Sequence, residues 1–125
     1  WEDTGHLMLA GAFAVLLEAV PSQPAEQITK SFSIPIYGIG AGDKVDGQLL
    51  IMHDLLGFYP DFKPKFAKCY TSEFEWNNLT LIEIIKTSIQ RYISDVKTNN
   101  FPTKEYIYSI KPEEVEELKK SKYWI

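Results

Sequence analysis

The feature that most constrains the fold of this chain is a near-continuous apolar run from Ala12 to Val20, which Pro21 ends. Within the run, the β-branched residues Val15 and Val20 favour an extended backbone. A strand that is apolar at successive positions suits burial on both faces, as in parallel sheets covered by helices. The run therefore predicts a parallel strand of an α/β protein.

A helix is expected directly after this strand. Ser22 or Gln23 can cap it, and Pro24 fits its first turn. Its predicted apolar stripe recurs at helical spacing and consists of Ala25, Ile28 and Phe32. A second apolar run, Ile34–Ile39, predicts the next strand. Because parallel neighbours need a crossover connection, this strand–helix–strand order predicts parallel pairing.

A third apolar run, Gln48–Met52, closes with His53 and Asp54 and predicts a third strand. Beyond it, prolines and interleaved lysines over residues 58–70 predict an irregular surface loop. We expect this loop to lead into a long helix.

The long helix is predicted to begin at Thr80, because Thr80 and Glu83 fit the capping-box pattern. One apolar face continues for several turns and consists of Ile82, Ile85, Ile89, Tyr92, Ile93 and Val96. Asn99 and Pro102 should end the helix. A short, charged surface helix over Glu113–Lys122 has its acids first and its lysines last, as the helix dipole favours.

Three parallel strands would leave sheet edges unpaired and strand faces uncovered, so we expect the chain to be part of a larger fold. A (β/α)8 barrel takes about 250 residues and eight strands. The chain is predicted to divide into residues 1–100, a portion of such a sheet, and residues 101–125, a tail with a short charged helix.

Composition and charge exclude several classes of protein. The formal net charge is -4, and no basic stripe is present to neutralise a phosphate backbone, so nucleic acid is not an expected partner. The apolar stretch Leu7–Val20 is too short and too polar to cross a bilayer. The single cysteine, Cys69, cannot form an internal disulfide, and we expect a reducing compartment such as the cytoplasm.

Glu18 is the strongest catalytic candidate, because it is the only charged residue between Leu7 and Val20 and stands at the carboxyl end of the first predicted strand. Barrel enzymes place their catalytic groups at that end of their strands. A carboxylate desolvated by Leu16, Leu17 and Val20 would be a stronger base, suited to accepting a proton near neutrality. The alternative is a strand-end glutamate that turns to solvent or caps the next helix.

Gly40 and Gly42 could offer a backbone surface on which a planar or anionic substrate rests, although a tight turn is the simpler interpretation. The dinucleotide fingerprint would need glycine where Asp43 stands. His53 and Asp54 could bind a metal or relay a proton, but adjacent strand residues point to opposite faces, so turn hydrogen bonds are favoured. The remaining candidates are Lys63, Lys65 and Lys68, which could attract an anionic substrate. The favoured interpretation is that these lysines form a solvent-exposed surface.

Four ordered motifs together resemble the ketopantoate hydroxymethyltransferase family: Gly11–Pro21, Ile34–Gly42, Asp46–Asp54 and Pro64–Lys68. More weakly, the resemblance extends to the helix after Thr80 and to the segment Phe101–Glu105. The sequence departs from the family at Tyr106, where histidine is usual, and residues 111–125 look like an added tail.

The resemblance implies a (β/α)8 TIM barrel to which this chain supplies only the last three strands and their helices. It implies transfer of a hydroxymethyl group from 5,10-methylenetetrahydrofolate to 3-methyl-2-oxobutanoate, giving 2-dehydropantoate for pantothenate biosynthesis. Glu18 matches the family's proton acceptor. Magnesium is the implied cofactor, but its ligands are expected in the preceding half of the barrel, with no metal ligand in this chain. A cytoplasmic homo-oligomer is implied, and the 125 residues alone should be inactive.

Two alternatives stay open from the sequence. One is a related barrel enzyme, a carbon–carbon lyase that acts on a keto acid. The other is a non-catalytic module that assembles with a partner chain through its exposed strands, because unpaired strand edges promote association.

Overall fold

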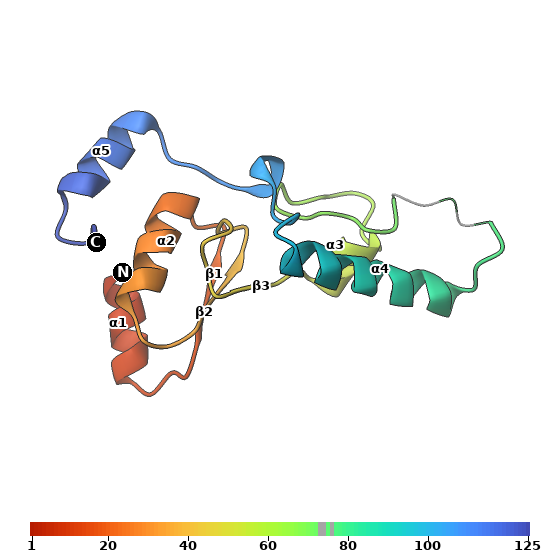
Figure 1. Cartoon of the computed structure of the whole chain (residues 1–125), viewed down its shortest axis with the longest axis horizontal. Helices are drawn as coiled ribbons and strands as arrows, with labels where there is room; N and C mark the ends of the chain where they lie inside the picture. The colour runs from red at the N-terminus through yellow and green to blue at the C-terminus, as the bar shows by residue number, and fades with distance from the viewer. Residues whose placement is uncertain (73–74, 76) are drawn as a thin grey trace.

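The structure is a computed structural model that describes residues 1–72, 75 and 77–125. In chain order, its elements are α1 (Glu2–Leu9), β1 (Val15–Glu18), α2 (Ser22–Ser31), β2 (Ile36–Ile39), β3 (Gly47–Gln48), α3 (Met52–Leu56), α4 (Leu81–Lys97), the 3-10 helix η1 (Lys104–Tyr106) and α5 (Pro112–Lys120). Figure 1 shows an elongated molecule, with α1, α2 and α5 at one end, α3 and α4 at the other, and the short sheet between them.

The predicted strand–helix–strand unit is confirmed. β1 pairs with β2 in parallel, and the register places Leu16 beside Tyr37 and Glu18 beside Ile39. The α2 helix makes the crossover between the two strands, as parallel geometry requires. Its predicted side-chain cap is wrong, because Pro21 stands at the cap position and no side chain caps the helix.

The core of this unit lies between the sheet and α2. Side chains alternate between the two faces of a strand, so Val15 and Leu17 of β1 point to the same side. They pack in one cluster with Ala25 and Ile28 of α2 and with Ile36 of β2. The first run was predicted to be strand from Ala12 onward, which is wrong in its extent, because β1 begins only at Val15 and the Phe13 side chain is 89% exposed.

The third predicted strand is largely wrong. Only Gly47 and Gln48 pair with β2, and His53 and Asp54 belong to α3 rather than to a strand end. The apolar side chains that follow Gln48 leave the sheet and are buried elsewhere. Leu49 and Leu50 pack against a cluster formed by Ile39, Phe66 and Ala67, and Leu55 and Leu56 of α3 pack with Tyr70. This contact with the loop over residues 58–70 replaces strand pairing.

The long helix is confirmed as α4, and its capping box is present. The Thr80 hydroxyl oxygen accepts a hydrogen bond from the Glu83 N–H at 3.4 Å, and the Glu83 carboxylate accepts one from the Thr80 N–H at 2.8 Å. Near the other end of α4, Asp95 accepts hydrogen bonds from Lys68 Nζ at 2.9 Å and from Tyr70 Oη at 3.0 Å. These bonds fasten α4 to the loop beside α3.

The chain then returns to the other end of the molecule. The Tyr108 carbonyl accepts a hydrogen bond from the Ser22 N–H at 3.0 Å, which holds the tail against the start of α2. The predicted charged helix is confirmed as α5. Beyond it, the Ile125 N–H donates to the buried Gln27 side chain at 2.9 Å. Both chain ends therefore lie together beside α1 and α2 (Figure 1).

The described residues form one three-stranded parallel sheet in the order β1-β2-β3, so the α/β class is confirmed. The sheet is open, and an eight-stranded barrel goes beyond what these residues form. Within the described part of the chain, no helix combines the length and the apolar character needed to span a bilayer.

Candidate active-site face

Glu18 is the last residue of β1, and its place follows from the alternation of the strand. Val15 and Leu17 face α2, so Leu16 and Glu18 face the opposite side of the sheet. The chain turns sharply after Glu18, because Ala19 has a positive φ of 52° while its N–H still donates to Ile39 at 2.8 Å. Glu18 thus stands at the carboxyl edge of the sheet, on the face away from α2.

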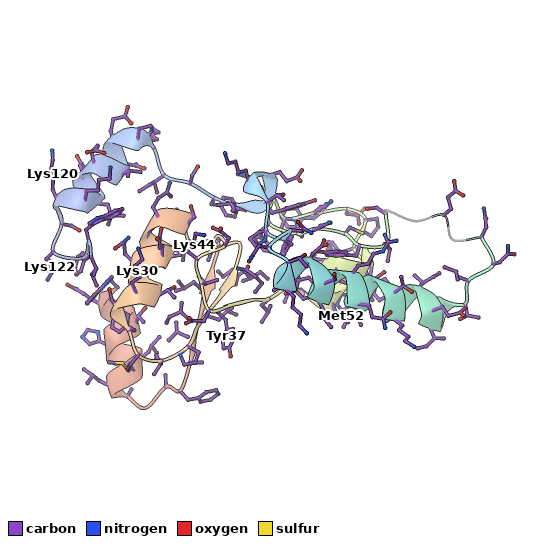
Figure 2. All side chains as sticks on the ribbon, in the orientation of Figure 1. Lys30, Tyr37, Lys44, Met52, Lys120 and Lys122 are labelled. Atoms are coloured by element: carbon purple, nitrogen blue, oxygen red, sulfur yellow. The ribbon has the colours of Figure 1, made fainter. Side chains whose placement is uncertain are left out.

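The face that carries Glu18 is open to solvent. The Glu18 side chain is exposed, and Leu16 and Tyr37 below it are 47% and 43% exposed. Figure 2 shows the Tyr37 side chain directed out of the sheet, away from α2. For the described residues, the prediction that apolar neighbours desolvate Glu18 is therefore wrong. The described residues cover only part of this face: Ile39, the partner of Glu18 in β2, is buried against Phe66 and Ala67, whereas Leu16 and Tyr37 stay about half exposed.

Gly40 and Gly42 take the positive φ angles predicted for a tight turn, 69° and 86°. Their open sides are filled by protein. A Cβ atom at Gly40 would lie 2.8 Å from the Phe66 side chain, and one at Gly42 would lie 2.6 Å from that of Ser22. These contacts explain both glycines by packing, and substrate binding at either position stays a prediction.

The other sequence candidates have contacts of their own. His53 lies on α3 and stacks edge-on against Phe58, with 5.9 Å between the ring centroids. Lys65 donates to the Ile107 carbonyl at 2.7 Å and so joins two loops, and Lys68 pairs with Asp95 and so joins its loop to α4. Cys69 is a free cysteine, and its thiol lies 3.2 Å from the Thr71 hydroxyl.

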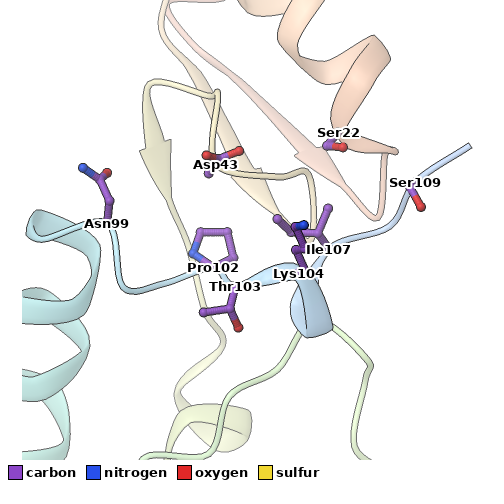
Figure 3. A pocket seen from close by; sticks show the side chains of 8 residues that line it. All are labelled: Ser22, Asp43, Asn99, Pro102, Thr103, Lys104, Ile107 and Ser109. Carbon is purple, nitrogen blue, oxygen red and sulfur yellow. The ribbon is translucent and has the colours of Figure 1, made fainter. Parts of the chain in front are cut away.

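A hollow of about 610 Å³ lies between the loops that follow β1 and β2 and the segment after α4 (Figure 3). Its walls combine polar and apolar surface and consist of Ser22, Asp43, Asn99, Pro102, Thr103, Lys104, Ile107 and Ser109. The sequence patterns did not single it out, because its walls come from segments far apart in the chain. Glu18 is not among its lining residues, so the hollow and the candidate base are separate features of this edge.

A magnesium site does not fit this part of the protein. Among the residues that the structure describes, no three His, Cys, Asp or Glu side chains are grouped so that they could hold a metal ion. Magnesium prefers carboxylate and water oxygens in near-octahedral geometry. Any ion used together with Glu18 would therefore need ligands from outside the described residues.

Comparison with known proteins identifies relatives over most of the chain. The sequence profile of ketopantoate hydroxymethyltransferase matches residues 1–104. The chain is 47% identical over 107 residues to the 3-methyl-2-oxobutanoate hydroxymethyltransferase of Caldicellulosiruptor bescii, which covers 86% of this chain and 38% of that protein. It is 44% identical over 117 residues to the protein of the same name from Clostridioides difficile, covering 94% of this chain and 40% of the relative.

A third relative of that name, from Campylobacter curvus, is 48% identical over 99 residues, which cover 79% of this chain and 34% of the relative. The chain thus spans about two fifths of the length of the curated relatives that it matches. The four motifs between Gly11 and Lys68 lie within the matched residues. By the extent of this match, the chain belongs to the ketopantoate hydroxymethyltransferase family.

Proposed function

We propose that this chain carries the proton acceptor of a 3-methyl-2-oxobutanoate hydroxymethyltransferase, with Glu18 in that role. The observation that supports the proposal most directly is the position of Glu18. It leaves the carboxyl end of a parallel strand on the face opposite the helix, where α/β-barrel enzymes place their catalytic groups. The family match adds the substrates, 3-methyl-2-oxobutanoate and 5,10-methylenetetrahydrofolate.

The reaction needs a base at this place. The hydrogen on the carbon beside the ketone of 3-methyl-2-oxobutanoate is weakly acidic, and its removal gives an enolate. Glu18 would accept this proton, and the enolate carbon would then form the new bond to the one-carbon unit. The two carbon–nitrogen bonds that hold this unit on the folate would break, water would supply the hydroxyl group of 2-dehydropantoate, and tetrahydrofolate would leave. When bound to the keto acid, a divalent cation such as magnesium supplies charge stabilisation for the enolate. Its ligands would lie outside the described residues.

The resemblance and the open sheet together support a barrel as the setting of this site. A parallel sheet is normally covered on both faces, but among the described residues the face opposite α2 is covered only in part and leaves Leu16 and Tyr37 about half exposed. We place residues 1–100 in the last part of a (β/α)8 barrel and residues 101–125 in a tail. The family resemblance further supports a cytoplasmic homo-oligomer. These 125 residues alone would not catalyse the reaction, because the resemblance implies that the magnesium ligands belong to the preceding half of the barrel.

The test is the Glu18→Gln substitution in the complete protein that carries this segment. Two readouts separate the base role from folate binding: turnover to 2-dehydropantoate, and exchange of the substrate hydrogen with solvent deuterium in the absence of folate. We expect both rates to fall by roughly 100-fold or more, the typical contribution of a general base. The melting temperature is measured alongside and should stay unchanged, because glutamine has nearly the same size and shape as glutamate.

Glu26→Gln is the matched control. Glu26 lies on α2, on the far side of the sheet core, where it pairs with Lys30 at 2.8 Å on the helix surface. This substitution removes one carboxylate of the same type and should leave both rates unchanged. Normal hydrogen exchange in Glu18→Gln would remove Glu18 from the proton-acceptor role.

A further inference from the structure

The hollow of about 610 Å³ at the carboxyl edge of the sheet has walls that are fixed in place. One wall follows β1 and β2, where Gly42 lies so close to Ser22 that an added Cβ would be 2.6 Å from that side chain. The opposite wall is the segment 99–109. Its Tyr108 carbonyl accepts a hydrogen bond from the Ser22 N–H at 3.0 Å, and its Phe101 side chain is buried. Walls held in this way need little ordering when a ligand binds.

The hollow lies near Glu18 without including it. Ser22, which lines the hollow, comes four residues after Glu18, and Asp43 comes four residues after Ile39, the β2 partner of Glu18. Because four residues of extended chain span at most about 14 Å, each lining residue lies within that distance of the strand end before it. In the proposed enzyme, the keto acid must contact Glu18, so the hollow is available to a part of the other substrate that does not react.

The walls of the hollow offer apolar surface and positive charge together. Pro102 and Ile107 supply the apolar part, and Lys104 supplies a cation from the same segment (Figure 3). Asp43 lines the hollow from the loop after β2, but its carboxylate already pairs with Lys44 at 3.1 Å. Lys104 has no ion-pair partner among the described residues. The hollow therefore suits a ligand that combines an apolar ring with negative charge.

We propose that this hollow binds the 4-aminobenzoyl-glutamate half of the folate co-substrate. The inference rests on the proposed function, which supplies the folate. The benzoyl ring lies against Pro102 and Ile107, and a glutamate carboxylate pairs with Lys104. The Ser109 hydroxyl, which also lines the hollow, can donate a further hydrogen bond to a carboxylate oxygen.

Size, charge and reaction geometry favour this half of the folate. The hollow of about 610 Å³ falls within the usual range for small-molecule sites, about 300–1,000 Å³, and the small keto acid would fill only a minor part of it. Lys65 places a second cation beside the wall that carries Lys104, with its Nζ 2.7 Å from the Ile107 carbonyl, which favours the carboxylates over the uncharged pterin ring. The one-carbon unit is bonded to the amine of the aminobenzoyl group, so this placement leaves it outside the hollow, able to reach the enolate formed at Glu18.

The test is a titration of the chain with 4-aminobenzoyl-glutamate, followed by NMR of the backbone amides. We expect a dissociation constant of about 0.1–1 mM, as a ligand fragment of this size allows. The amide signals that shift should be those of Asn99, Thr103, Lys104 and Ser109. Two related compounds divide the contributions: the dimethyl ester keeps the ring but loses the charges of both carboxylates, and N-acetylglutamate keeps the carboxylates but loses the ring. Both should bind at least about fivefold more weakly.

Lys104→Met tests the cation, because it removes the charge and keeps most of the aliphatic side chain. It should weaken binding of 4-aminobenzoyl-glutamate by about fivefold, the upper end for an exposed ion pair, and should remove the difference between this compound and its dimethyl ester. Lys86→Met is the matched control. Lys86 is exposed on α4 and is not among the residues that line the hollow, so this change should leave binding unaltered.

Four results would overturn the inference. The first is no binding of 4-aminobenzoyl-glutamate, and the second is equally tight binding of its dimethyl ester. The third is an equal loss of affinity in Lys104→Met and Lys86→Met, and the fourth is a set of amide shifts confined to residues away from the hollow. None of these readouts involves turnover or Glu18. Normal hydrogen exchange in Glu18→Gln would therefore count against the proposed base alone, and absence of binding would count against the folate site alone.

Discussion

Substituting Gly40 by alanine separates its packing role from a ligand-binding role. An alanine at this position must keep the positive φ of 69°, which costs an L-residue about 1–2 kcal/mol. Its Cβ would also lie 2.8 Å from the Phe66 side chain, which is buried in a core cluster, and such overpacking costs about 1–3 kcal/mol. The lower entropy of the unfolded alanine chain returns about 0.4–1 kcal/mol. The free energy of unfolding should therefore fall by roughly 1–4 kcal/mol.

The assay is urea unfolding of the chain followed by circular dichroism, with Gly11→Ala as the matched control. Gly11 has a positive φ of 96°, but nothing lies within 4 Å of an added Cβ, so its substitution measures the backbone cost alone. The difference between the two variants should be about 1–3 kcal/mol, the part due to Phe66. If Gly40→Ala destabilises no more than Gly11→Ala, the packing argument fails. A raised KM for the keto acid in the complete enzyme, with unchanged stability, would instead support substrate contact at Gly40.

Three further outcomes follow from single contacts. Burial opposes ionisation of Asp95, but its hydrogen bonds from Lys68 and Tyr70 lower its pKa below the usual value. These bonds should therefore stabilise the fold fully above about pH 4 and lose effect as the pH falls through the lowered pKa. Asp95→Asn should cost about 1–3 kcal/mol near neutrality and flatten that acid dependence, as urea titrations across pH would show. Thr80→Ala should cost about 1 kcal/mol and fray the start of α4, visible as faster amide exchange there. Gly47→Ala should turn the Tyr37 ring away and change its tyrosine fluorescence with little loss of stability, because that ring is half exposed.

Local signals explain which elements could be predicted from the sequence. The β1–α2–β2 unit depends on apolar runs, a proline at the helix start and one crossover, all within neighbouring residues. The capping box of Thr80 and Glu83 is equally local, and both of its hydrogen bonds are present. The first helix, α1, had no such signal, since the sequence patterns gave no interpretation of residues 1–6.

The third strand shows where local signals fail. An apolar run of five residues satisfies its burial equally well in a sheet or against another apolar surface, and its periodicity does not distinguish the two. Leu49 and Leu50 are buried by Phe66 and Ala67, which come later in the chain. Whether this run forms a strand is therefore decided by a contact with residues that are distant in sequence. The hollow lined by Ser22, Asp43 and Lys104 escaped prediction for the same reason.

For Glu18, the position could be predicted from local sequence signals, but the hydration of its side chain could not. Its place at a strand end and its face of the sheet follow from alternation and are present in the structure. Its hydration depends on what covers that face, and no pattern within β1 encodes the cover. An exposed carboxylate is a weak base toward a carbon-bound proton, whereas one in an apolar, water-poor site is stronger.

The two apolar side chains next to Glu18 on the open face are themselves half exposed, so they cannot exclude water from it in this chain. The elements that would cover Leu16 and Tyr37 would also be the ones that strengthen the base. In the proposed enzyme, they would come from outside the described residues, as would the ligands of any magnesium ion. The rate of proton removal should therefore depend on the elements that cover Leu16 and Tyr37 as well as on Glu18 itself. A substitution that uncovers the face, such as Leu16→Asp in the complete enzyme, should slow substrate hydrogen exchange with the carboxylate still in place; unchanged exchange would show that desolvation is not what strengthens the base.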